Sequence, residues 1–197
     1  MSGASGGALA FLKAFVPGVV ARGRVDAADT DRAADTPEQI NQRVRDEVAS
    51  TMPVRVLSIT PVQTVGQQDG EHGPRLFARD PDACCALRKV EPLERALSGY
   101  DAWATGVRRG ETAARATARE VDFDGSRGKV KVSPIVGWSD ADVAAYIERY
   151  DVPVNALFSQ GYGSIGCWPC TRKVKPGEDP RAGRWAMFDK TECGLHQ

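Results

Sequence analysis

Residues 129–150 read KVKVSPIVGWSDADVAAYIERY, and this stretch decides the fold class. Its first part, residues 129–136, reads as a β-strand. Ser139 follows as a helix N-cap, with Asp142 at the position that completes a capping box. The helix that begins here has an apolar face and ends near residue 150. A strand that passes into a capped helix in this way is typical of α/β proteins.

Strands and helices alternate in the rest of the chain as well. We expect further strands at residues 54–60 and at residues 102–107. We also expect one helix from Pro37, a second over residues 86–97, and a short helix near Val65. This alternation predicts an α/β fold with a partly parallel sheet that is flanked by helices.

The two ends of the chain differ from this middle part. Residues 1–35 are rich in Ala, Gly, Arg and Asp and show no sustained helical or strand period. We expect them to form a low-complexity segment that precedes a domain of residues 36–197. Residues 151–197 are dense in Gly, Pro and charge, and are too irregular to fold on apolar packing alone. This irregularity suggests that a metal site organises them.

The charge balance excludes some classes of partner. The chain carries 26 basic and 26 acidic side chains, so it has no global basic field that would hold nucleic acid. No apolar run approaches the length that spans a membrane. A short apolar stretch at residues 8–20 lacks the preceding positive charge of a secretory signal. We therefore predict a cytoplasmic protein that binds neither nucleic acid nor membranes, and we leave open whether it forms a homo-oligomer.

Five cysteines form two pairs and a single residue: Cys84, Cys85, Cys167, Cys170 and Cys193. In a cytosolic chain this pattern indicates metal binding or catalysis rather than disulfide bonds. The two thiolates of a C-x-x-C loop can converge on one metal centre. Neighbouring side chains normally point apart, so an adjacent pair suits a cubane cluster better than a tetrahedral zinc ion. The residues alone leave three alternatives, namely a cluster, a zinc site or a redox dithiol.

Several ordered motifs together resemble those of bacterial and plant-type adenylylsulfate reductases. Residues 84–93 (CCALRKVEPL) match the family segment CC-x-x-R-K-x-x-P-L. The other matching stretches are residues 103–109 (WATGVRR, with Arg115 following), 165–170 (IGCWPC), 179–185 (DPRAGRW) and 192–196 (ECGLH). The resemblance runs from about residue 37 to the C-terminus.

The resemblance implies a fold like that of the adenine-nucleotide α-hydrolases and a [4Fe–4S] cluster. The implied cluster ligands are Cys84, Cys85, Cys167 and Cys170. Relatives that reduce the 3′-phosphorylated substrate usually lack these cysteines, so the resemblance favours adenylylsulfate as substrate, with 3′-phosphoadenylylsulfate as the alternative. Because the electrons come from thiols, we expect the cluster to be structural and electrostatic.

The resemblance also implies that Cys193 is the catalytic nucleophile, on a C-terminal tail of about residues 186–197. Cys193 is expected to attack the sulfur of adenylylsulfate, expel AMP and form a thiosulfonate. A thiol of thioredoxin then releases sulfite.

An anionic substrate requires positive charge that converges on the reacting group. By resemblance, the substrate-binding candidates are Lys89, Arg115, Arg181, Arg184 and His196. Arg108 and Arg109 are further candidates because they follow a predicted strand, and α/β sheets bind ligands at the carboxyl ends of strands.

The sequence departs from the family in one respect. Family members carry a Ser-Gly-Gly-Lys-Asp-Ser type loop that binds the adenylate, and no such loop is present here. The Ser5-Gly6-Gly7 run has no Lys-Asp-Ser after it. We therefore expect a truncated chain that binds AMP weakly and turns over poorly. The alternatives are an inactive remnant and a metal-stabilised binding module without chemistry.

Overall fold

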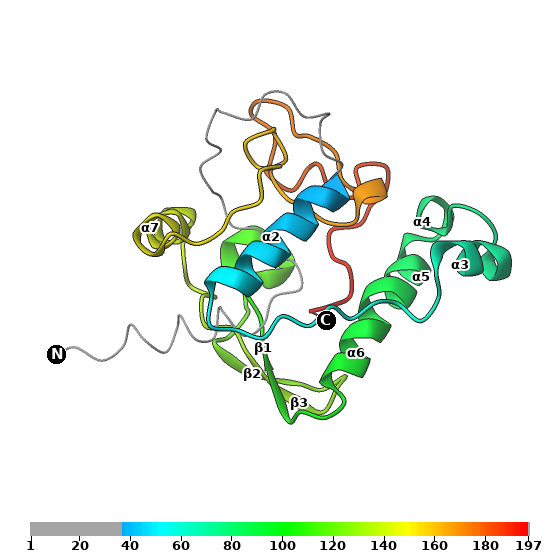
Figure 1. Cartoon of the computed structure of the whole chain (residues 1–197), viewed down its shortest axis with the longest axis horizontal. Coiled ribbons are helices and arrows are strands. Elements are labelled where there is room, and N and C mark those ends of the chain that lie inside the picture. The colour runs from blue at the N-terminus through cyan, green and yellow to red at the C-terminus, as the bar shows by residue number, and fades with distance from the viewer. Residues whose placement is uncertain (1–36, 197) are drawn as a thin grey trace.

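The computed structural model describes residues 37–196, shown in Figure 1. The expected low-complexity segment at residues 1–35 lies outside the described residues. Within the described part, a small mixed sheet lies at the bottom of this view and an irregular C-terminal segment at the top, with α2 between them. No described helix is both long enough and apolar enough to cross a membrane.

Most helices precede the sheet in the chain. The α-helices are α2 (Pro37–Thr51), α3 (Val65–His72), α4 (Leu76–Arg79), α5 (Pro81–Cys85), α6 (Glu91–Leu97) and α7 (Asp140–Tyr150). A π-helix, η1 (Ala86–Val90), joins α5 to α6, so one continuous helical run carries the first cysteine pair. Three short 3₁₀ helices complete the set: η2 (Arg109–Glu111), η3 (Ala113–Arg115) and η4 (Trp168–Cys170).

The sheet has three strands in the order β1-β3-β2. Strand β1 (Ala102–Ala104) is parallel to β3 (Lys129–Val132), and β2 (Val121–Asp124) is antiparallel to β3. Trp103 of β1 pairs with Lys131 of β3. The expected α/β fold with a partly parallel sheet is therefore confirmed, although β2 was not expected.

The prediction of a strand at residues 54–60 is wrong. This stretch has no regular secondary structure and leaves apolar side chains such as Leu57 and Ile59 exposed. A strand is stable only when its backbone groups pair with a neighbour, and each strand of the described sheet has its partners elsewhere.

The other expected elements exist with different bounds. The strand of residues 129–136 ends at Val132, because Pro134 has no N–H to donate and a turn follows. The strand of residues 102–107 ends at Ala104, although the Thr105 N–H still donates to the Val132 carbonyl at 2.8 Å. The expected helices from Pro37, near Val65 and after Ser139 are all present. The helix expected from Ala86 starts earlier, at Pro81, where Asp80 caps it by accepting from the Ala83 N–H.

Two buried clusters hold the irregular C-terminal segment. In one cluster, Ile40 of α2 packs against Leu157 and Tyr162, and Asn155 donates to the Asn41 side chain at 2.5 Å. The other cluster surrounds Trp185. The segment is therefore packed on α2 and on the cysteine-bearing helix rather than built from helices of its own.

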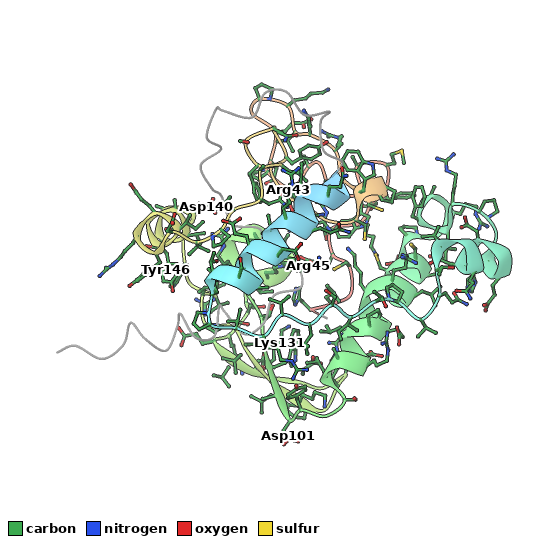
Figure 2. The ribbon with its side chains drawn as sticks, viewed as in Figure 1. Arg43, Arg45, Asp101, Lys131, Asp140 and Tyr146 are labelled. Atoms are coloured by element: carbon green, nitrogen blue, oxygen red, sulfur yellow. The ribbon has the colours of Figure 1, made fainter. Side chains whose placement is uncertain are left out.

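The last described residues run back toward the sheet. In Figure 1 the red tail passes between α2 and the helices α5 and α6. Figure 2 shows Lys131 on the sheet below α2, while Asp140 and Tyr146 lie on α7 at the side of the molecule. Because the Lys131 ammonium donates to the His196 carbonyl at 3.1 Å, the tail reaches the sheet itself.

Replacing Ser139 with Ala should destabilise the fold at the start of α7. The Ser139 hydroxyl accepts from the Asp142 N–H at 3.1 Å, and the Asp142 carboxylate accepts from the Ser139 N–H at 2.8 Å. Loss of such a cap lowers the free energy of unfolding by about 0.5–2 kcal/mol, which urea denaturation measures. Ser159→Ala is the control, because this exposed hydroxyl only donates to the Ala156 carbonyl. Equal unfolding midpoints for the Ser139 and Ser159 variants would contradict the assignment of Ser139 as the cap of α7.

Candidate functional site

The first cysteine pair lies in the last turn of α5, where Cys84 is half-buried and Cys85 is buried. Successive side chains on an α-helix are about 100° apart, so the two thiols project in different directions. Gln68 of α3 lies close enough to the Cys84 thiol to lower its pKa, against the larger effect of burial, which raises it. The helix therefore presents two ligand atoms that reach separate positions of one site.

The second pair is shaped by η4, which Cys167 precedes as its N-cap. The Cys170 N–H donates to the Cys167 carbonyl at 3.0 Å, and the Thr171 hydroxyl donates to the same carbonyl at 2.9 Å. This tight turn keeps the backbone of the two cysteines close together, as a C-x-x-C metal site requires.

The four paired thiols face one another across the two segments. Burial raises the pKa values of the Cys84, Cys85 and Cys170 thiols, and the Cys167 sulfur raises each of them further. The Lys89 ammonium acts in the opposite direction on all three. Among residues 37–196 no three Cys, His, Asp or Glu side chains are close enough to hold a single metal ion.

Trp185 joins the two cysteine pairs to Cys193. Its side chain is only 2% exposed, and it packs with the buried Cys85 and Cys193 while Cys170 lies against the same cluster. The backbone N–H of Trp185 donates to the Cys170 carbonyl at 3.0 Å. Its backbone has a φ of 48°, in the left-handed region that a bulky residue rarely adopts. Such conformations persist where surrounding contacts impose them, often at functional sites.

Three cations lie against the Trp185 ring. The Arg184 guanidinium is 4.4 Å from the ring centroid, and the ammonium groups of Lys89 and Lys190 are 5.6 and 5.7 Å from it. Burial lowers the pKa of Arg184, whose Nη1 donates to the Ile165 carbonyl at 2.9 Å. The arrangement concentrates positive charge beside the Cys193 thiol, as an anionic substrate requires.

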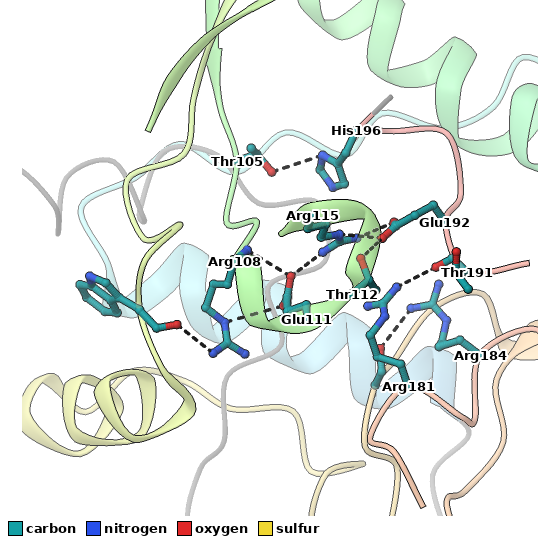
Figure 3. A network of polar contacts seen from close by, with 12 residues as sticks. Thr105, Arg108, Glu111, Thr112, Arg115, Arg181, Arg184, Thr191, Glu192 and His196 are labelled. Carbon is teal, nitrogen blue, oxygen red and sulfur yellow. Dashed lines mark hydrogen bonds and ion pairs between the residues drawn. The ribbon is translucent and has the colours of Figure 1, made fainter. Parts of the chain in front are cut away.

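Two side chains just before Cys193 fasten the tail that carries it. Lys190 pairs with Asp82 of α5. Glu192 accepts two hydrogen bonds from Arg115, at 2.7 and 2.6 Å, and one from the Thr112 hydroxyl at 2.9 Å (Figure 3). Cys193 itself is 9% exposed, so the structure has the tail in a closed position.

His196 docks the end of the tail on the sheet. Its ring is stacked on Trp103, with centroids 6.0 Å apart, and its Nδ1 lies 3.5 Å from the Thr105 hydroxyl (Figure 3). Burial, with Arg115 and Lys131 nearby, lowers the pKa of His196 to about 3. The imidazole is therefore neutral at neutral pH and supplies a hydrogen-bonding group rather than a charge.

The predicted substrate-binding residues fall into two groups. Lys89 and Arg184 lie at Trp185, and Arg181, which donates to the Thr191 carbonyl at 3.2 Å, holds the tail beside them (Figure 3). Arg115 pairs with the carboxylates of Glu111 and Glu192. Arg108 pairs with Asp140 at 2.7 Å, and the exposed Arg109 donates to the Ala118 carbonyl at 2.8 Å. The structure thus does not bring Arg108 and Arg109 to Cys193, and their substrate contacts stay a prediction.

Four residues of the site were not singled out from the sequence: Thr112, Trp185, Lys190 and Glu192. Glu192 stands next to Cys193 and Trp185 next to Arg184, so adjacency within the matching motifs was an available signal. Thr112 and Lys190 carried no such signal, because their partners are distant in sequence.

Comparison with known proteins identifies the family. A model of the phosphoadenosine phosphosulfate reductase domain matches residues 31–173. A Streptomyces coelicolor protein named adenosine 5′-phosphosulfate reductase is 55% identical over 172 residues, which are 87% of this chain and 72% of that protein. The chain belongs to the phosphoadenosine phosphosulfate reductase family.

Other members of the phosphoadenosine phosphosulfate reductase family agree. Proteins of the same name from Rhodococcus erythropolis and Mycobacterium tuberculosis are 49% and 53% identical, over 87% and 77% of this chain. The chain covers 69% and 60% of their lengths. A crystal structure of phosphoadenylyl-sulfate reductase from Candida auris, a phosphate complex, is 29% identical with a TM-score of 0.55. That likeness covers 68% of this chain and 65% of the other.

Replacing Gly166 with Ala should disturb the cations at Trp185. An added Cβ would lie 2.3 Å from Cζ of the Arg184 guanidinium, which is held by the Ile165 carbonyl. Such overpacking lowers the free energy of unfolding by about 1–3 kcal/mol, which urea denaturation measures. Gly99→Ala is the control, because an added Cβ there meets nothing within 4 Å. A Gly166 variant as stable as the Gly99 variant would show that Arg184 is not held in place.

Proposed function

We propose that this chain is an adenosine 5′-phosphosulfate reductase, which reduces adenylylsulfate to sulfite and AMP. One observation carries the proposal: the buried Cys193 thiol packs on Trp185, where Lys89, Arg184 and Lys190 concentrate positive charge. A buried nucleophile beside converging cations suits attack on a doubly anionic substrate. Relatives about half identical to this chain carry the same name.

In the first half-reaction the Cys193 thiolate attacks the sulfate sulfur of adenylylsulfate. An S–S bond forms, and the bond from that sulfur to the bridging oxygen breaks. AMP leaves with the bonding electron pair, the thiol proton passes to solvent, and a thiosulfonate remains on Cys193. Lys89 and Arg184 stabilise the negative charge that moves onto the departing phosphate.

In the second half-reaction a thiolate of thioredoxin attacks the Cys193 sulfur. The S–S bond breaks, and sulfite leaves with its electron pair. The second thioredoxin thiol then resolves the mixed disulfide, so thioredoxin is oxidised by two electrons and the Cys193 thiol is restored. Because Cys193 is 9% exposed in the closed tail, the tail has to open before another protein reaches this sulfur.

We further propose that Cys84, Cys85, Cys167 and Cys170 bind a [4Fe–4S] cluster. The two pairs lie near enough for Cys167 to raise the pKa values of Cys84 and Cys85, and Trp185 is tied to Cys170 and packed on Cys85. When bound, the cluster would supply a crosslink between α5 and residues 151–196. Since thiolate binding energy is folding energy here, it would organise a segment that has little regular structure. We also propose a cytoplasmic location, where thiols such as these are kept reduced.

An alternative substrate is 3′-phosphoadenylylsulfate, which the name of the Candida auris enzyme favours. The higher identity to the adenosine 5′-phosphosulfate reductases favours the substrate without the 3′-phosphate. Sulfite formation with thioredoxin and each nucleotide separates the two. Failure with both nucleotides would favour an inactive remnant or a binding module.

Replacing Cys170 with Ser should remove the cluster. The variant should lose the brown chromophore and its bound iron, and residues 151–196 should become sensitive to limited proteolysis, because a ligand that organises them is lost. Visible absorption and iron analysis measure the effect. Cys193→Ser is the matched control and should keep its iron. A Cys170 variant with unchanged iron content would overturn the ligand assignment.

Replacing Cys193 with Ser should abolish sulfite formation and leave the chromophore intact, because the nucleophile is lost while the four paired cysteines remain. In the parent protein, adenylylsulfate without thioredoxin should leave one sulfonate on one cysteine. Mass mapping locates that adduct. An adduct on any cysteine other than Cys193 would refute the mechanism.

A further inference from the structure

We propose that Glu192 is the positioning residue of the nucleophile, and that it holds Cys193 at Trp185 for attack by binding a carboxylate site built from Thr112 and Arg115. The inference rests on the proposed function for its kinetic consequence, but its structural part stands on the geometry of the tail. Figure 3 shows Glu192 reaching from the tail to the loop that carries these two residues.

The Glu192 carboxylate receives three hydrogen bonds. Arg115 donates from Nε and Nη2 to the two carboxylate oxygens, and Thr112 donates to one of them. The side chains of Glu192 and Arg115 are only 15% and 12% exposed. A charge-assisted, bidentate pair of this kind is among the stronger hydrogen-bonded contacts, and its burial protects it from screening by salt.

The carboxylate-binding site of Thr112 and Arg115 is held in place by contacts that do not involve the tail. Glu111 pairs with Nη1 of Arg115 and also accepts from the Arg108 N–H at 3.2 Å. These contacts lie within residues 108–115 and orient the guanidinium before the tail arrives. They also keep a partner for Arg115 if the Glu192 charge is removed, so a neutral variant does not leave a buried cation alone.

Arg115 was predicted to bind substrate, but each of its three side-chain nitrogens already donates to a carboxylate. Nε and Nη2 serve Glu192, and Nη1 serves Glu111. An anion that took the Nε and Nη2 edge of Arg115 would displace Glu192, and this would release Cys193 during the step that needs it. Lys89 and Arg184 at Trp185 are the better placed cations for the substrate.

Three side chains, Lys190, Glu192 and His196, anchor the tail near Cys193, and Glu192 makes the strongest contact of the three. Neighbouring Cα atoms are about 3.8 Å apart, so fixing Glu192 confines the Cys193 sulfur to a small volume. The Lys190 contact is weaker because Asp82 is 82% exposed, and exposed ion pairs contribute little. The His196 contact to Thr105 is long, at 3.5 Å, and lies beyond the turn at Gly194.

The two half-reactions make opposite demands on this anchor. Attack on the substrate needs Cys193 held beside the cations, whereas reduction by another protein needs the same sulfur exposed. Weakening the anchor should therefore slow the first half-reaction and spare the second. A residue that merely stabilised the fold would not divide the two steps in this way.

The first test measures the thiol itself and needs no turnover. Glu192→Gln in the full chain should raise the rate at which N-ethylmaleimide alkylates Cys193, located by mass mapping, by about tenfold to a hundredfold. Glu178→Gln is the matched control, because Glu178 pairs with Arg172 at 2.8 Å in the same C-terminal segment and touches none of the site. Thr112→Val removes one of the three donors and should give an intermediate rate. An unchanged rate in both the Glu192 and Thr112 variants would overturn the proposal.

The second test follows the two steps separately. With Glu192→Gln, single-turnover formation of the Cys193 thiosulfonate should slow by about tenfold to a hundredfold, while thioredoxin releases sulfite from the preformed adduct at the parent rate or faster. Equal slowing of both steps would also overturn positioning. If the parent protein forms no adduct, the proposed function fails, and the alkylation rates still decide whether Glu192 holds the tail.

Discussion

The burial of Trp185 among thiols and cations is the contact on which the rest of this structure depends. Cys85 comes from a helix, Cys170 from a short loop and Cys193 from the tail, and all three pack at this one ring. The indole also offers its face to Lys89, Arg184 and Lys190, which makes an apolar side chain compatible with nearby positive charge. The left-handed backbone at Trp185 is the conformational cost of bringing these segments together.

Much of the α/β architecture could be predicted from the sequence, because its signals are local. The Ser139 capping box, the helix from Pro37 and the strand at Lys129 each depend on neighbouring residues. The failure at residues 54–60 has the opposite cause. Strand propensity favours an extended chain, but only a pairing partner, which is a long-range property, makes a strand.

The residues of the site likewise divide into those that local sequence signals predict and those that only long-range contacts reveal. The five cysteines were recognisable from spacing and motif, and the structure brings them into two facing pairs and a third position at Trp185. The cations were harder to assign, since a guanidinium serves substrates and carboxylates equally well. Only contacts 77 residues apart in sequence reveal that Arg115 serves Glu192. Arg108 follows a strand as expected, yet turns toward Asp140 of α7.

The π-helix at Ala86–Val90 separates two helical faces with different tasks. A π turn accommodates one residue more than an α turn, which shifts the angular phase of everything that follows it. In α5 that phase directs Cys85 to Trp185, whereas in α6 it buries Leu97 completely. The extra residue therefore lets one continuous helical run direct Cys85 to Trp185 and Leu97 to the core. A uniform α-helix of the same length would turn one of these two side chains away from its contacts.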